Sequence, residues 1–438
     1  PDRWQSYTMS VPKFDIVVYG ASGVTGSLVT QYLAAHPQKP RMAVAGRNRS
    51  KVEGVLNNLT GVDKERIQSI EVMEASTSDP ASIKRMAESA KVVMNLVGPY
   101  VHLGGLEVAK AAAEAAAAYV DLNGESLFYA RVVEEVQAQA QKTKSIVMPS
   151  MGLDSLPADL GTYLAVQEVK KVAGPETPIG DVFHGMRLRG TISGGTITTF
   201  AGMRSYPDQL KYANSYWFSP VKGTAQSEKP GALFLPQFNR WGAYSLFAPL
   251  NTRVVQRTWG MFEQRIGAAG YGRSFRYHEG LVTPHVVLAW LVSFIWLLAS
   301  FLLRNVELFG KLLTTLVPQG TAPSLEEQLK GWADFRTLAV SEDGKAKGLA
   351  VIQVKGDAGY LKSATMVSEA ALAIALDYDN LSPIAKQGGV LTTATLGGEL
   401  MAQRLMKYGG FVIASRDVTN VQDVSTALFD GKGPAEYK

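Results

Sequence analysis

Three glycines spaced three residues apart, Gly20, Gly23 and Gly26, stand between a short apolar run and a stretch of helix-forming residues. The first glycine permits a tight turn, the second lets the backbone approach a pyrophosphate, and the third allows close packing of helix on strand. The N–H groups and the dipole at the start of a helix attract phosphate. The sequence therefore predicts a dinucleotide-binding loop, whose contacts are expected from Gly20, Ser22, Gly23, Val24, Thr25 and Gly26.

The residues that follow the second expected strand indicate which dinucleotide binds. NAD-specific domains place an Asp or Glu about twenty residues beyond the last glycine, where it binds the ribose 2′-hydroxyl. Here Gly46 is followed by Arg47 and, two residues later, by Arg49, and this neighbourhood contains no acidic residue. Guanidinium groups form charge-assisted hydrogen bonds with phosphate. We therefore expect NADP(H) as the cofactor, with Arg47 and Arg49 at its 2′-phosphate.

The elements that position this loop alternate between strand and helix over residues 14–150. Strands are expected at Phe14–Tyr19, Arg41–Ala45, Ile67–Met73, Val92–Val97, Ala118–Leu122 and Lys144–Pro149. Helices are expected at Gly26–Ala35, Ser50–Leu59 (capped by Ser50), Pro80–Ala90 and Gly105–Ala117. This alternation is typical of an α/β fold with a doubly wound parallel sheet, the Rossmann domain. The polar residues 1–13 are expected to be an N-terminal extension.

Several polar residues end the later strands, at the carboxyl edge where such sheets bind ligands. Four residues are expected to lie at the nicotinamide ribose: Asn95, Val97, Gly98 and Pro99. The candidates for acid–base catalysis are Tyr100, Asp121 and Asp154, with Glu125 also considered. For each candidate, a role in holding a loop by hydrogen bonds remains open.

Other chemistries are excluded by residue type and spacing. The chain has no cysteine, and its five histidines show no ligand spacing, so no metal site is expected. None of the 17 tyrosines has a lysine four residues later, which excludes the Tyr–Lys pair of short-chain dehydrogenases, and there is no GxSxG or Walker lysine motif. A net charge of +5 over 438 residues is too small for a nucleic-acid partner.

The pattern changes after residue 150. Residues 151–380 are expected to form a second, α+β domain for substrate binding and dimerisation, in which Arg336–Lys355 folds as a hairpin turning at Glu342–Gly344. A capping box at Ser324–Glu327 opens a helix, and Ser193–Thr196 could cradle an anionic group. Residues 381–438, with an expected helix at Gly397–Tyr408, are a C-terminal segment that returns to the core.

An uncharged segment of eighteen residues, 286–303, interrupts the second domain. A helix of this length extends ~27 Å, just short of the ~30 Å hydrocarbon core of a bilayer. Trp290, Phe294 and Trp296 lie close together in it, and a second apolar stretch, 306–317, follows. We expect a membrane or lipid surface as a partner of 286–303, with an in-plane anchor or monotopic hairpin favoured over a full span. A buried core helix is the alternative.

Taken together, these motifs resemble those of saccharopine dehydrogenase-like oxidoreductases. The resemblance extends over nearly the whole chain and rests on Tyr19–Gly26, Ala45–Arg47, Asn95–Tyr100, Tyr119–Glu125, Gly152–Asp159, Ser193–Thr196, Ala322–Ser324 and Gly388–Thr392. The chain departs from the family pattern at Leu103, Gly105 and Thr393, which concerns the substrate loop and leaves the cofactor site intact. The resemblance implies a Rossmann domain with an inserted α+β domain. Relatives include lipid-droplet and membrane proteins of eukaryotes and mycobacterial reductases that act in trans on lipid chains.

These observations predict an NADP(H)-dependent reductase of a lipophilic carbonyl, imine or enoyl substrate. Its expected place is the cytoplasmic side of a membrane or lipid droplet, and secretion is not expected because the first apolar run is only as long as a strand. A homodimer is also expected. Two alternatives remain open, a soluble saccharopine-type amino-acid dehydrogenase and a non-catalytic scaffold that binds the cofactor.

Overall fold

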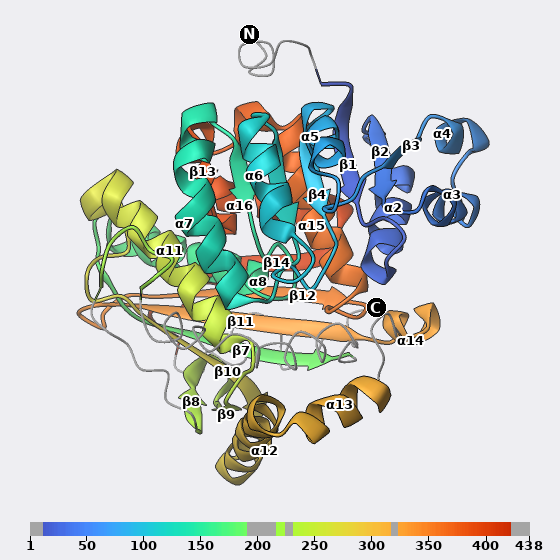
Figure 1. Cartoon of the computed structure of the whole chain (residues 1–438). Helices are drawn as coiled ribbons and strands as arrows, with labels where there is room; N and C mark the ends of the chain where they lie inside the picture. The colour runs from blue at the N-terminus through green and yellow to red at the C-terminus, as the bar shows by residue number, and fades with distance from the viewer. Residues whose placement is uncertain (1–11, 191–215, 224–230, 317–322, 422–438) are drawn as a thin grey trace. The chain divides into compact units, whose positions relative to one another are not determined.

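The computed structural model describes residues 12–190, 216–223, 231–316 and 323–421. The chain divides into two units (Figure 1). Among the described residues, the first comprises 12–152 and 360–391, and the second comprises 153–190, 216–223, 231–316, 323–359 and 392–421. The predicted Ser193–Thr196 cradle and most of the predicted N-terminal extension lie outside the described residues.

The first unit is built on a sheet of seven strands in the order β13-β6-β5-β4-β1-β2-β3. All six neighbouring pairs are parallel. The strands are β1 (Phe14–Tyr19), β2 (Met42–Gly46), β3 (Glu71–Glu74), β4 (Ala90–Asn95), β5 (Ala118–Asp121), β6 (Ile146–Met148) and β13 (Gly389–Val390). The central strands are apolar and buried on both faces, as a parallel sheet between helical layers requires. This confirms the predicted doubly wound α/β fold.

Helices cover both faces of this sheet (Figure 1). They are α2 (Val24–Ala35), α3 (Arg49–Asn57), α4 (Lys64–Gln68), α5 (Pro80–Glu88), α6 (Gly105–Glu114), α7 (Ser126–Thr143) and α15 (Leu361–Leu376). On one face α6 packs between α5 and α7, and on the other α15 packs on α2 and against β1, β4 and β5. Helix α15 therefore completes the second face of the sheet, although it follows the strands it covers by more than two hundred residues in the chain.

Two local expectations for the first unit are wrong. Residues 67 and 68 belong to helix α4, and the third strand begins only at Glu71, because Lys64–Gln68 closes a helical turn after Asp63. The N-cap of α3 is Asn48, whose side chain accepts a hydrogen bond from the N–H of Lys51, so Ser50 lies inside the helix.

The second unit contains a mixed sheet in the order β14-β12-β11-β7-β10-β9-β8. Its strands are β7 (Ile179–Arg189), β8 (Leu233–Leu235), β9 (Arg240–Ala243), β10 (Arg276–Thr283), β11 (Trp332–Ser341), β12 (Lys347–Lys355) and β14 (Phe411–Asp417). The predicted hairpin is present as β11 and β12, which pair antiparallel around Gly344 in a left-handed conformation. The α+β architecture of this unit was predicted.

Three helices pack together in the second unit: α8 (Leu156–Ala173), α11 (Ala248–Ile266) and α16 (Thr393–Tyr408). Helix α8 contacts four strands of the sheet and is buried over most of its length. The predicted capping box opens α14 (Leu325–Leu329), where Ser324 and Glu327 bond to each other's backbone N–H groups. Two further helices, α12 (Val286–Asn305) and α13 (Glu307–Leu316), follow β10.

The C-terminal segment contributes to both units. Strand β13 adds an edge to the parallel sheet, and α16 and β14 join the second unit. Helix α15 belongs to the first unit although it precedes residue 381, so the predicted limits of 14–150, 151–380 and 381–438 differ from the division in the structure. The physical reason is that α15 buries its apolar face on β1, β4 and β5.

Candidate functional site

The predicted phosphate loop lies between β1 and α2 in the first unit. Gly20 has a φ of +87°, a conformation that side chains rarely adopt, and a Cβ on it would also clash with Val97. A Cβ on Gly26 would clash with the carbonyl oxygen of Gly20, so the helix approaches the turn as closely as a glycine allows. Helix α2 begins after Gly23, which provides no side-chain cap. Its first-turn N–H groups are therefore available to a phosphate.

Ser22 and Gly23 are exposed, and Val24 and Thr25 are half-buried, so the loop presents its backbone to solvent. The hydroxyl oxygen of Ser22 lies 4.0 Å from the position of a Cβ on Gly46, at the end of β2. This places the loop beside the residues expected to select the cofactor. The geometry fits a dinucleotide pyrophosphate on the loop and its adenosine ribose at the end of β2.

The two arginines expected at the 2′-phosphate differ in their surroundings. Arg47 is exposed and makes no hydrogen bond or ion pair within the described part of the chain. Arg49 is held by Glu53, with 2.8 Å between Nε and Oε1, and also donates to the carbonyl oxygen of Val72. Arg47 is therefore the guanidinium that can turn to a phosphate without breaking an ion pair.

The predicted nicotinamide-side turn follows β4. The Oδ1 of Asn95 accepts a hydrogen bond from the N–H of Val97 at 3.1 Å, and its Nδ2 donates to the hydroxyl of Tyr119. The Gly98–Pro99 peptide bond is cis. Asn95 is fully buried, so it shapes the turn, while Val97, Gly98 and Pro99 are half-buried at its surface.

Tyr100 occupies a position that does not suit a proton donor. Its hydroxyl donates to the carbonyl oxygen of Asn95 and accepts from the N–H of Leu122, both at 3.2 Å. The ring packs on Phe128 and is almost completely buried, and burial raises the pKa of the phenol well above its ordinary value. Glu125 likewise accepts from the N–H groups of Tyr100 and Val101. Through these hydrogen bonds, both side chains link the residues that follow β4 to those that follow β5. This is the structural role that was left open for them.

Asp121 is also buried completely, at the end of β5. Its Oδ1 accepts hydrogen bonds from the N–H groups of Ser150 and Asn123, each at 2.8 Å. Burial raises the pKa of the carboxyl to about 7, although those two hydrogen bonds oppose the shift. Its Oδ2 accepts no hydrogen bond within the described part of the chain. Asp121 thus fixes the strand ends around the site and does not reach solvent.

Asp154 differs from the other two candidates because it is only half-buried. Its carboxylate makes no hydrogen bond or ion pair with the described residues, and desolvation raises its pKa to about 7. It is the second residue of the second unit, two positions after Gly152. Among the predicted catalytic residues, it is the one whose carboxyl combines a raised pKa with partial exposure.

The turn that carries Asp154 is held from within the second unit. Ser155 has a φ of +85°, which is strained for a residue with a side chain. Its hydroxyl donates to Oδ1 of Asn251 at 3.1 Å, and Asn251 donates to Oε2 of Glu279 at 2.9 Å. Tyr277 donates to the same Glu279 oxygen. This buried chain of hydrogen bonds orients the residue next to Asp154.

Sequence reasoning did not identify one titratable residue at the edge of the first unit, Lys362 at the start of α15. The neighbouring Ser363 packs on Gly152, where a Cβ would lie 2.9 Å from the serine hydroxyl. Lys362 is half-buried, and burial lowers the pKa of its amine. No motif marks this lysine, because it reaches the sheet through a helix distant in sequence.

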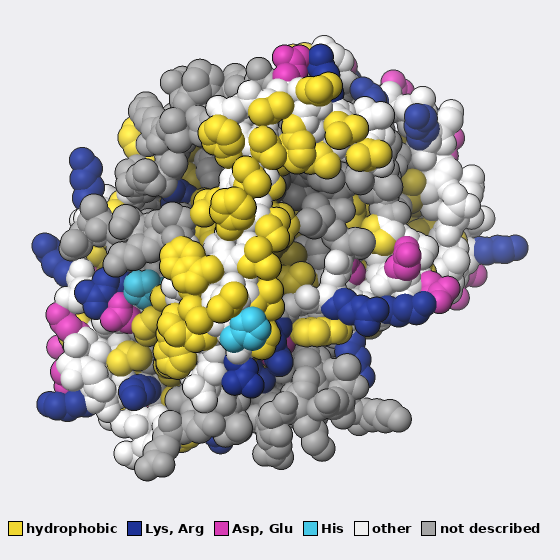
Figure 2. Space-filling view, turned by 90° about the horizontal axis from the view of Figure 1, so that it is seen from below, with side chains coloured by type: hydrophobic (Ala, Val, Ile, Leu, Met, Phe, Trp, Pro, Cys, Tyr) yellow, Lys and Arg dark blue, Asp and Glu magenta, His cyan; other side chains and the backbone are white. Residues whose placement is uncertain are grey.

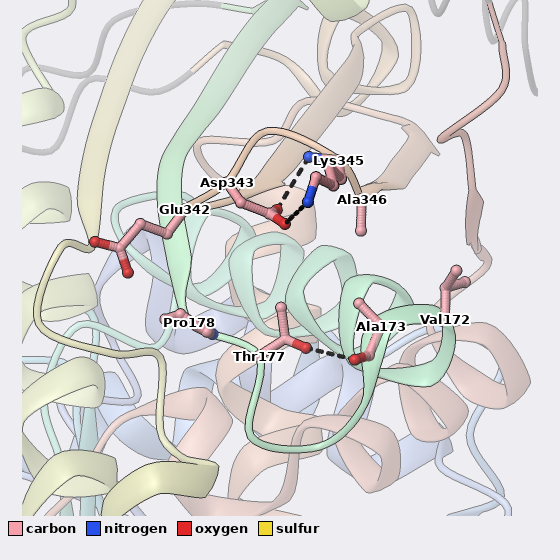
Figure 3. Close-up of a pocket in the computed structure, with 8 residues that line it drawn as sticks. All are labelled: Val172, Ala173, Thr177, Pro178, Glu342, Asp343, Lys345 and Ala346. Carbon is pink, nitrogen blue, oxygen red and sulfur yellow. Dashed lines mark hydrogen bonds and ion pairs between the residues drawn. The ribbon is translucent and has the colours of Figure 1, made fainter.

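A surface hollow of about 600 Å³ lies elsewhere in the second unit. Figure 3 shows its lining, in which Asp343 pairs with Lys345 on the β11–β12 turn and the hydroxyl of Thr177 donates to the carbonyl oxygen of Ala173 at the end of α8. The hollow is at the C-terminal end of α8, whereas Asp154 precedes its N-terminus. The eighteen residues of that helix separate them by ~27 Å. The hollow is therefore not the site of cofactor chemistry.

Known proteins share these features. Residues 16–148 match the family described as the saccharopine dehydrogenase NADP binding domain. A Mycobacterium tuberculosis protein named as a trans-acting enoyl reductase is 32% identical over 427 residues, covering 92% of this chain and 97% of its own. The trans-acting enoyl reductase of Mycobacterium bovis is 30% identical, covering 91% and 96%. The chain belongs to the saccharopine dehydrogenase-like family.

As a member of this family, the protein is an NAD(P)-dependent oxidoreductase, and its first unit is an NADP-binding domain. The predicted cofactor, NADP(H), and the predicted family are confirmed. The apo saccharopine dehydrogenase (L-Glu forming) of Saccharomyces cerevisiae has a similar fold, with a TM-score of 0.50 over 92% of this chain and 99% of that chain. Its sequence is only 13% identical, so this likeness concerns the fold alone.

Proposed function

We propose that the protein uses NADPH to reduce the carbon–carbon double bond of a lipophilic enoyl group. The observation that carries this proposal is the match of about 30% identity over more than nine-tenths of the chain with proteins named as trans-acting enoyl reductases. That match includes the second unit, in which a substrate-binding region is expected. A lipophilic carbonyl or imine, reduced by the same cofactor, is the less favoured substrate.

The residues of the first unit would bind and orient the cofactor. The α2 N-terminus and Gly23 would hold the pyrophosphate, Arg47 the 2′-phosphate, and the turn at Gly98 the nicotinamide ribose. NADPH, when bound, supplies a hydride for the β-carbon of the enoyl group. Asp154 would give its proton to the α-carbon, so that the double bond gains two hydrogens and the carboxylate remains.

The proposed location is a lipid surface on the cytoplasmic side of a membrane or lipid droplet. Its support is the eighteen-residue window Val286–Leu303, which has a mean hydropathy of 2.5 and is only 11% buried. A core helix of this composition would be covered by protein. A lipophilic acyl substrate at the same surface would have a short path to the enzyme.

The test is a turnover assay with purified protein, NADPH and enoyl thioesters of short and long chain length. We expect NADPH consumption, faster for the long chain, and a product heavier by two hydrogens in mass spectrometry. Oxidation of a saccharopine-type secondary amine with NADP⁺ would instead support the amino-acid dehydrogenase. Tight NADPH binding with no turnover of enoyl, carbonyl or imine substrates would support the scaffold.

A further inference from the structure

Helix α12 has two different faces along its whole length. The side that includes Ala289 and Ser293 is buried or half-buried from the first turn to the last. The hydroxyl of Ser293 accepts from the N–H of Tyr244, just after β9, and donates to the carbonyl oxygen of Gly231. The first half of the helix therefore has one side against the second unit, at Ala289 and Ser293, and is not surrounded by solvent or lipid on all sides.

The opposite face of α12 is apolar and exposed. Its large exposed side chains are Val287, Trp290, Leu291, Phe294, Ile295, Leu297, Leu298 and Phe301, with Val287 70% and Phe294 62% exposed. Helix α13 adds Leu308, Leu312 and Leu316, which recur every four residues on one side. Figure 2 shows hydrophobic side chains gathered in one band over α12 and α13.

The polar side chains described in these two helices turn inward to their own helix. Ser300 donates to the carbonyl oxygen of Trp296, Asn305 to that of Phe301, and Thr315 to that of Lys311, each at 2.8 Å. Lys311 forms an ion pair with Glu307 at 2.8 Å. The exposed face thus offers few directional bonds to a partner protein, whereas hydrocarbon requires none.

The two tryptophans of α12 differ from these polar side chains, which bond within their own helix. The indole N–H groups of Trp290 and Trp296 have no acceptor within the described part of the chain. Trp290 is exposed, with its ring edge against Gly231, and Trp296 is half-buried. An indole with an apolar body and a free N–H suits the boundary between acyl chains and headgroups. The exposed apolar side chains and the two indoles therefore favour the same environment, the outer part of a lipid leaflet.

We infer that α12 and α13 together form an in-plane anchor in one leaflet of a phospholipid bilayer. The anchor does not span the bilayer, because one side of α12 is buried against the protein at Ala289 and Ser293 and half-buried beyond them. The inference rests on the lipid-surface location proposed above, and it adds the second helix and the orientation of both. In-plane helices of this kind lie about 5–10 Å below the headgroup boundary.

The absence of cysteine from the chain makes the test direct, since a single introduced thiol can be labelled without background. Single variants Val287→Cys, Phe294→Cys, Phe301→Cys and Leu312→Cys carry an environment-sensitive fluorophore. The full-length protein is mixed with vesicles of phosphatidylcholine and phosphatidylserine whose acyl chains bear quenchers at defined depths. Lys345→Cys, at the exposed β11–β12 turn, is the aqueous control.

We expect all four labels to shift to the blue and to be quenched from one shallow depth, while the control is not quenched. A profile that is deepest at residue 294 and shallow at 287 and 301 would overturn the inference in favour of a span. Labels protected without lipid, with a dimer in sedimentation, would overturn it in favour of a second copy of this chain.

A second measurement tests the inference without labels, in case a cysteine variant reacts poorly with the fluorophore or misfolds. Phe294→Asp and Leu312→Asp are each expected to lower the vesicle partition coefficient at least about tenfold. Val412→Asp, at a residue of β14 with similar exposure, should leave it unchanged. Equal partitioning of all three folded variants would overturn the anchor. NADPH oxidation of a short enoyl thioester in detergent reports on the proposed reaction separately, so failure of that reaction leaves the depth profile interpretable.

Discussion

Gly20 and Gly26 meet so closely that the carbonyl oxygen of the first fills the space where a Cβ of the second would lie. Gly23, in the same loop, is less crowded, since its Cβ would lie 3.3 Å from that oxygen, a tight contact that a small shift relieves, and its φ of −76° suits any residue. The loop therefore needs Gly20 and Gly26 for folding, and we expect it to need Gly23 for its ligand.

Gly23→Ala should leave the fold intact and weaken NADPH binding at least tenfold, about 1.4 kcal/mol, because the methyl group would stand where the pyrophosphate passes. Gly26→Ala should instead lower the free energy of unfolding by about 1–3 kcal/mol through overpacking. Denaturant unfolding and calorimetric titration with NADPH separate the two effects. Unchanged NADPH affinity in a folded Gly23→Ala protein would show that the loop serves another purpose.

Arg47→Ala should remove most of the preference for NADPH over NADH, about 1.5–3 kcal/mol for hydrogen bonds to a charged group. The affinity for NADH should hardly change, because NADH has no 2′-phosphate. Arg49→Ala is the matched control, since Arg49 is already paired with Glu53 and should matter less. Titration calorimetry with both cofactors measures this, and equal affinities in the unmodified protein would refute the assignment.

Tyr100→Phe should reduce stability rather than catalysis. The variant leaves the carbonyl oxygen of Asn95 and the N–H of Leu122 without their partner, at a cost of about 1–3 kcal/mol. Turnover of the folded variant should stay within a few-fold of the original. A loss of about a hundredfold or more, with unfolding unchanged, would instead make Tyr100 the proton donor.

The cofactor half of this site could be predicted from sequence because its signals are local. Gly20, Gly23 and Gly26 stand in one turn, and Arg47 follows the next strand, so spacing alone brings them together. The apolar segment 286–303 is likewise recognisable from composition alone, and it forms a helix whose eighteen-residue window is only 11% buried, while its contact with lipid stays a prediction. The parallel sheet also follows from short-range alternation.

Sequence could name the catalytic candidates but could not choose among them, because the contacts that distinguish them join residues distant in sequence. Tyr100 and Asp121 have residue types that suit catalysis, and only the burial of both side chains shows that they hold strand ends. Lys362 approaches the sheet on α15, which packs against strands that precede it by more than two hundred residues. Long-range packing of this kind leaves no motif around the residue itself.

Asp121→Asn should change how stability depends on pH. Folding raises the pKa of Asp121 from 3.8 to about 7, so its contribution is fully present below pH 4 and is lost as pH rises to 7. The asparagine keeps an oxygen for the N–H groups of Ser150 and Asn123 and carries no charge. The variant should therefore match the original near pH 4 and exceed it at pH 8, by a few kcal/mol at most. Denaturant unfolding at several pH values measures the difference, and parallel curves would contradict it.

Asp154→Asn should nearly abolish reduction while NADPH still binds. Proton transfer from a positioned acid accounts for about 10²- to 10⁴-fold in rate, and the amide cannot replace it. Because the pKa of Asp154 is about 7, kcat of the original protein should fall as pH rises above 7, when the carboxyl loses its proton. The residual rate of Asp154→Asn should show no such fall, and Asp154→Glu should restore part of the rate together with the pH dependence. A pH profile that is the same in the original protein and Asp154→Asn would exclude Asp154 as the donor and direct attention to Lys362.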